Sequence, residues 1–158
     1  MRWVSPALLA LALSACGYSL SAGKNRLPEG AQRIFVRPFE DRTTDADAGA
    51  LVAAALRQEL ARRGAGGGSE APARIEGAVE ETSFGASSPN GATYRIAVTV
   101  SARLVVDGKV RAEQRARREE DWLAGQDPLE SEGRRRLALR RAAEALAREI
   151  VERFETVF

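Results

Sequence analysis

The chain has 158 residues, which is enough for one ordinary domain and too few for two sizeable ones. Hydrophobic residues make up 44% and charged residues 29% of it, so the composition is that of a globular chain. The sequence contains no histidine and a single cysteine. It therefore excludes a histidine-dependent catalytic triad, an internal disulfide and a metal site built from several thiolates, and we expect no metal and no cofactor.

The first fifteen residues have the pattern of an export signal. Arg2 precedes an apolar run that ends at Leu13, and two small residues follow. The run of about ten apolar residues is shorter than the roughly 20 that span a bilayer as a helix. It therefore predicts that residues 1–15 are a signal peptide that is removed, and not a membrane anchor.

Cys16 follows this segment directly. The sequence Leu13-Ser14-Ala15-Cys16-Gly17 resembles a bacterial lipobox, which implies that Cys16 is acylated and becomes the first residue of the mature chain. Several acyl chains, at about 0.8 kcal/mol per buried methylene, hold a domain on a membrane firmly. Because Gly17 and not aspartate follows the cysteine, the resemblance implies the outer membrane. An ordinary leader or a buried structural thiol is the alternative.

Residues 16–30 are polar and predict a lipidated tether, so that residues 31–158 form the domain. Arg33–Arg37 has the β-branched and aromatic residues of a strand, which Pro38 stops. Thr44 and Asp47 have the spacing of a capping box before a helix that Gly64 ends. The apolar stripe of this helix consists of Ala48, Leu51, Val52, Ala55, Leu56 and Leu60.

The middle of the chain predicts a loop and three strands. Gly64–Pro72 is rich in glycine and predicts a surface loop. Apolar and polar residues then alternate, and Asn90-Gly91 and Asp107-Gly108 give reversals between the strands. The predicted strands of this meander are 74–84, 94–104 and 109–119.

The last element is a long helix that begins at Asp127-Pro128, because proline suits the first turn. The order strand, helix, three strands, helix predicts an α+β fold in which a four-stranded, mostly antiparallel (mixed) sheet has both helices on one face. The first strand is expected to run parallel to a neighbour, since a crossover helix follows it. The other face of the sheet is then polar and exposed, with Arg95, Thr99, Ser101, Arg103, Arg111, Arg115 and Arg117.

Three short segments suggest a family. Cys16-Gly17-Tyr18, Leu27-Pro28-Glu29-Gly30 and the run Ile34 to Thr43, which contains Pro38-Phe39-Glu40-Asp41, resemble the opening of LptE, the LPS-assembly lipoprotein family. The resemblance implies a non-enzymatic lipoprotein on the periplasmic side of the outer membrane. Its implied partners are the β-barrel LptD, which it plugs and helps to assemble, and lipopolysaccharide.

Lipopolysaccharide carries phosphates, which bind arginine and lysine by charge-assisted hydrogen bonds. The candidate binding residues on the sheet are Arg95, Arg103, Lys109 and Arg111, and the tip from Phe84 to Thr93 is a second location. Ion pairing on a solvated strand face is the alternative role for each residue. Trp122 is interpreted as a cap on the core or as an anchor for a partner.

Two other functions are weighed. A hydrolase could use paired acids among Glu80, Glu81, Glu119, Glu120 and Asp121, but their position among arginines favours ion pairing. A periplasmic lipoprotein that tethers or activates a cell-wall enzyme would share the fold and the anchor. The run Arg115–Arg118 is too short and too interrupted by acids to indicate nucleic acid, which an exported protein does not meet. Arg134–Arg136 predicts a solvated helix face, and a contact with lipid headgroups or the barrel is the alternative.

Overall fold

The structure is a computed structural model, which describes residues 27–45, 47–89 and 91–157. Residues 1–26, including Cys16 and the predicted signal peptide, lie outside the described residues. The described part contains two helices and five strands, in the order that the sequence predicts with one short strand added. They are β1 (Ile34–Val36), β2 (Glu40–Asp41), α2 (Ala48–Arg62), β3 (Ala73–Ala86), β4 (Thr93–Val106), β5 (Lys109–Leu123) and α3 (Pro128–Thr156).

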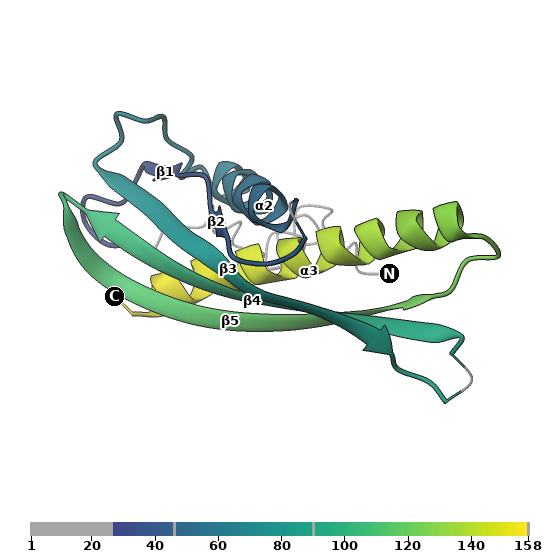
Figure 1. Cartoon of the computed structure of the whole chain (residues 1–158). Helices are drawn as coiled ribbons and strands as arrows, with labels where there is room; N and C mark the ends of the chain where they lie inside the picture. Colours follow the sequence, from purple (N-terminus) through teal and green to yellow (C-terminus); the bar gives the residue numbers. More distant parts are fainter. Residues whose placement is uncertain (1–26, 46, 90, 158) are drawn as a thin grey trace, which may run out of the picture.

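The sheet has the strand order β1-β3-β4-β5, and β2 also pairs with β3. The first strand runs parallel to β3, whereas β3, β4 and β5 form an antiparallel meander. Both helices lie on one side of the long, curved sheet, with α3 along β5 and α2 beside it (Figure 1). The predicted α+β fold is therefore confirmed, and the three meander strands are longer than the sequence indicates.

Two segments pair with the sheet where no strand is predicted. Glu40–Asp41 runs parallel to β3 opposite Ala78–Val79. In the glycine-rich segment after α2, the Ala65 carbonyl accepts a hydrogen bond from the Ile34 amide at 2.8 Å, and the Gly67 amide donates to the Ile34 carbonyl at 2.9 Å. The prediction that Gly64–Pro72 is only a surface loop is therefore wrong for these residues. Such short pairings leave no periodic pattern in the sequence.

The core lies between the sheet and the two helices. Aliphatic side chains of β3 and β4 meet the apolar stripes of both helices, and Phe154 of α3 is the largest fully buried side chain. The apolar stripe of α3, which consists of Leu139, Ala143, Leu146, Ile150 and Phe154, is buried, whereas Val157 after the helix is exposed. Burial of these stripes against one sheet face stabilises the helices far more than their intrinsic propensities do.

A charge cluster joins the ends of the two helices. Glu59 of α2 is buried, and Arg63 bonds it through Nε at 2.6 Å and reaches Glu155 of α3 through Nη1 at 2.7 Å. Burial raises the pKa of Glu59, but the bonds from Arg63 and Arg62 outweigh it and hold the pKa below its usual range. The paired carboxylate is therefore ionised at neutral pH, which fixes α2 against α3.

Candidate binding surfaces

The outer face of the sheet, which is the face without helices, carries a ladder of ion pairs. The antiparallel register places side chains of β3, β4 and β5 in rows across the sheet. Within and between these rows, arginine nitrogens lie 2.7 to 3.5 Å from carboxylate oxygens. The pairs across strands are Arg103–Glu76, Arg115–Glu80, Arg117–Glu81, Arg95–Glu119 and Arg95–Asp121. This face is polar, as predicted, and largely neutralises its own charge.

Thr99 does not fit the predicted exposed face. It lies on the outer face of β4 but is only 4% exposed. Glu81 is its neighbour on β3 and Arg117 its neighbour on β5, and these two side chains form an ion pair at 3.4 Å. The pair spans the strand between them and covers Thr99. The prediction that Thr99 is exposed is therefore wrong, because long charged side chains can bury a short one between them.

The four candidate lipopolysaccharide-binding residues fall into two pairs. Arg95 donates to both carboxylate oxygens of Asp121, at 2.7 and 3.0 Å, and Arg103 lies 3.5 Å from Glu76. Lys109 and Arg111 begin β5 and have no ion pair within the described residues. A change in the β4–β5 register falls at Arg111. Arg95 lies near the start of β4, whereas Arg103, Lys109 and Arg111 lie near the β4–β5 turn, so the structure does not bring the four side chains into one cluster.

The carboxylates weighed for hydrolysis are dispersed over the ladder. Glu80, Glu81, Glu119 and Asp121 each pair with an arginine, and the bond from Arg95 holds the pKa of Asp121 below its usual range. A general acid needs the opposite shift, towards neutral pH. A shallow hollow of about 520 Å³ lies on this face near Glu76, Glu80 and Arg103, and it is lined mainly by paired charges.

A cluster of aromatic side chains lies at the opposite end of the sheet from Lys109. Phe84, Tyr94 and Trp122 come from three neighbouring strands, and their ring centroids are 5.5 to 6.4 Å apart. Trp122 packs against the core, whereas Phe84 is 65% exposed. The hairpin tip and the β5–α3 connection meet at this end (Figure 1). In the sequence, Trp122 and the Phe84–Thr93 tip are separate candidates. The strand register places them side by side.

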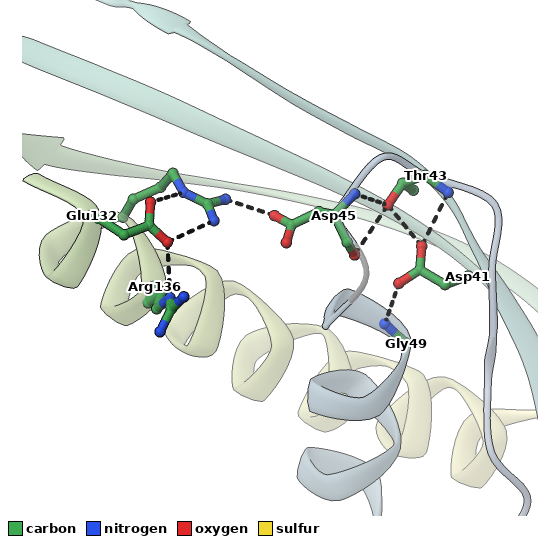
Figure 2. A network of polar contacts seen from close by, with 7 residues as sticks. Asp41, Thr43, Asp45, Gly49, Glu132 and Arg136 are labelled. Atoms are coloured by element: carbon green, nitrogen blue, oxygen red, sulfur yellow. Dashed lines mark hydrogen bonds and ion pairs between the residues drawn. The ribbon is translucent and has the colours of Figure 1, made fainter.

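A polar network links the start of α2 to α3 (Figure 2). The N-cap of α2 is Asp47, whose side chain makes no capping hydrogen bond, so the predicted Thr44–Asp47 capping box is wrong. Instead Asp41 accepts hydrogen bonds from the Gly49 amide at 2.9 Å and from the Thr43 hydroxyl at 2.7 Å. Burial raises the pKa of Asp41, but these bonds outweigh it and lower the pKa. Asp41 thus caps the helix from outside its first turn.

Arg135 completes the network from α3. Its Nη1 donates to Asp45 at 2.6 Å, and its Nε donates to Glu132 at 2.8 Å (Figure 2). Glu132 also accepts from Arg136 at 2.8 Å. The predicted solvated face of Arg134–Arg136 therefore holds a contact between the two helices, since Arg135 is largely buried. No local pattern indicates this contact, because Asp45 and Arg135 are 90 residues apart in the chain.

This network predicts an acid-sensitive contribution to stability. The hydrogen bond from Arg135 is the main cause that lowers the pKa of Glu132 from 4.5 to about 2. A carboxylate with a lowered folded-state pKa stabilises the fold above its ordinary pKa, and this contribution is lost as the pH falls from about 4.5 towards 2. With Glu132→Gln, we expect the free energy of unfolding to fall less over this pH range than it does in the unchanged protein. Urea denaturation at several pH values measures the difference. Glu144→Gln changes a partly buried glutamate of α3 that has no ion pair within the described residues, and this matched control should leave the pH dependence of stability unchanged.

The described helices do not include one that is long and apolar enough to cross a membrane. Within residues 27–45, 47–89 and 91–157 there is also no group of three or more acidic, cysteine or histidine residues that could hold a metal ion.

The fold is shared by several bacterial lipoproteins of known structure. A putative lipoprotein from Caulobacter crescentus superposes with a TM-score of 0.64 at 19% identity, over 85% of this chain and 96% of that one. A minor lipoprotein from Acinetobacter baumannii gives a TM-score of 0.54 at 12% identity, over 79% and 92% of the two chains. Rare lipoprotein B from Shewanella oneidensis gives a TM-score of 0.50 at 13% identity, over 75% of this chain and 93% of that one. These likenesses define the architecture as one that small bacterial lipoproteins adopt.

The particular family follows from the sequence itself. The model of the LptE family, described as lipopolysaccharide-assembly, matches residues 31–154, which is nearly the whole described domain. The chain therefore belongs to the LptE family, and the resemblance that its opening segments suggest is confirmed. No curated protein matches the chain significantly.

Proposed function

We propose that this chain is an outer-membrane lipoprotein that plugs an LptD-like β-barrel, helps it to assemble, and binds lipopolysaccharide for insertion into the outer leaflet. The observation that carries the proposal is the match of the LptE family over residues 31–154. Acylated Cys16 is the proposed anchor on the periplasmic face, after removal of residues 1–15. The protein acts by binding and not by catalysis.

The outer face of the sheet supports the role of a plug. The interior of a membrane barrel is polar, so a protein seated in it must present polar groups that do not add uncompensated charge. The ladder of Arg95, Arg103, Arg115 and Arg117 with the carboxylates beside them meets this requirement. The arginines of these pairs are about half exposed or more, so each pair contributes little stability alone, which leaves its groups free to exchange partners.

We propose that lipopolysaccharide binds to the four basic residues Arg95, Arg103, Lys109 and Arg111. Lys109 and Arg111 can bind a phosphate directly, because no carboxylate of the described residues pairs with them. Arg95 and Arg103 must first give up Asp121 and Glu76. We therefore expect phosphate contacts of Lys109 and Arg111 to form at a smaller cost than those of the other two.

The test is purification of the full-length tagged protein from detergent-solubilised outer membranes, followed by mass spectrometry. We expect a large β-barrel in nearly equal amount, bound lipopolysaccharide, and an N-terminal peptide that begins with acylated Cys16. A matched purification of an unrelated tagged outer-membrane lipoprotein controls for detergent carry-over. Recovery of a cell-wall enzyme without a barrel would overturn the proposal in favour of a tethered activator.

A further inference from the structure

Apolar side chains remain exposed at the end of the molecule that carries the aromatic cluster. Beside Trp122, a groove runs between the end of β5 and the first half of α3; we call it the distal groove. Leu123 is 62% and Leu137 45% exposed at its sides. Its lining consists of Thr93, Asp121, Trp122, Leu123, Arg134, Leu137, Ala138 and Arg141. Phe84 and Leu129 at the same end of the molecule are also exposed, and such exposed apolar side chains beside a groove indicate an interaction site.

The charge at the groove favours an anionic occupant. Arg141 lines the groove and has no ion pair or hydrogen bond within the described residues, in which most other arginines are paired. Arg140, one residue earlier on α3, is also exposed and unpaired. Asp121 in the same lining is already bonded by Arg95. An anion at the mouth of the groove would therefore meet free arginine and a neutralised carboxylate.

The backbone of the groove disfavours a protein strand as the occupant. Arg134 donates to the carbonyl oxygens of Leu123 and Ala124, at 3.2 and 2.9 Å. The Ala124 amide donates to Ala92 at 2.9 Å, and the Gly125 amide to Ser131 at 2.9 Å. Strand addition depends on free main-chain donors and acceptors, and these bonds have used the Leu123 and Ala124 carbonyls and the Ala124 and Gly125 amides, where β5 ends beside α3. An aliphatic chain needs no hydrogen bonds and can bind against Trp122 and the two leucines.

We propose that the distal groove holds an acyl chain of lipopolysaccharide, with a phosphate of the same molecule at Arg141. This inference rests on the proposed function, and it adds a lipid-binding site that is separate from the four basic residues of the sheet. The apolar lining takes the chain, and the free guanidinium of Arg141 takes the anionic end. An amphiphile can therefore contact the apolar lining and Arg141 at the same time.

The test places a photo-crosslinking benzoylphenylalanine at Leu137 in the full-length protein in its own cells, whose lipids are labelled with radioactive acetate. Leu137 is partly exposed, so we expect the protein to fold with the larger residue. After irradiation, we expect a labelled adduct that an antibody to lipopolysaccharide detects. The same probe at Gln58, which is exposed on α2 and belongs to neither proposed binding surface, is the matched control and should give at least about fivefold less adduct.

A second set of variants tests the role of Arg141. With the probe at Leu137, Arg141→Glu should reduce the lipopolysaccharide adduct at least about fivefold, and Arg141→Lys should retain most of it. Arg57→Glu changes another unpaired arginine, on α2, and should have no effect. An adduct with protein or phospholipid only, or equal adducts at Leu137 and Gln58, would overturn the inference. Co-purification of the barrel is measured separately, so the plug function can stand if the groove assignment fails.

Discussion

Replacement of Gly77 by alanine is expected to destabilise the fold by about 3 kcal/mol or more. Gly77 lies in the middle of β3, where the Phe39 ring packs directly on the strand. A Cβ atom there would lie 2.1 Å from the Ser101 carbonyl oxygen of β4 and 2.8 Å from the Phe39 ring. The oxygen is part of the backbone and cannot rotate away, so the β3–β4 ladder or the Phe39 contact must shift. Urea denaturation of the purified protein measures the effect.

Gly85→Ala is the matched control for this prediction. Gly85 lies in the same strand and is exposed, and a Cβ atom there meets nothing within 4 Å. Because glycine weakens a strand interior, alanine at this position is expected to be neutral or slightly stabilising. If Gly77→Ala were as stable as Gly85→Ala, the close approach of Phe39 and Ser101 to Gly77 would be contradicted.

Gly77 and Phe39 also show how far the sequence predicts this fold. The alternation along 74–84, 94–104 and 109–119 predicts the meander, because a period of two is a local property of each strand. Proline in a first helical turn is also a local signal, and it predicts where the last helix begins. Asp127 caps this helix, because its side chain accepts a hydrogen bond from the Glu130 amide. The packing of Phe39 on Gly77 is not local, and no pattern in either segment indicates it.

The same limit explains the wrong prediction at the start of α2. Thr44 and Asp47 have the spacing of a capping box, but the carboxylate that binds the Gly49 amide belongs to Asp41. Asp41 ends β2, and its pairing with β3 opposite Val79 fixes its position over the helix end. The tertiary structure thus supplies a cap that competes successfully with the local one. This gives Asp41 of the Pro38–Thr43 segment a physical role in joining the sheet to the first helix.

The candidate binding residues depend on register in a similar way. The sequence predicts a polar face on the sheet, but it does not show which arginine lies beside which carboxylate. The register places Arg95 beside Asp121 and Arg103 beside Glu76, and it leaves Lys109 and Arg111 without such neighbours. The distal groove was beyond prediction, because its two walls come from β5 and α3 and meet only in the folded chain.

Phe154→Ala is expected to cost about 3–5 kcal/mol of unfolding free energy. Phe154 is fully buried near the end of α3, in the core cluster that also holds Leu60 of α2. Its removal loses the transfer free energy of the ring and leaves a cavity that the surrounding helices can fill only in part. Denaturant titration followed by circular dichroism measures the loss, and we expect the transition midpoint to fall with little change in slope.

Val157→Ala tests whether this loss comes from burial and not from the end of the helix. Val157 is three residues further along, at the C-cap of α3, and about half of its side chain is exposed. Removal of its methyl groups takes little surface from the core, so the expected change is within about 0.5 kcal/mol. A large loss for both variants would mean that the last turn of α3 is stabilised as a unit. A small loss for Phe154→Ala would contradict the closed packing of α3 against α2 and the sheet, on which the position of both proposed binding surfaces depends.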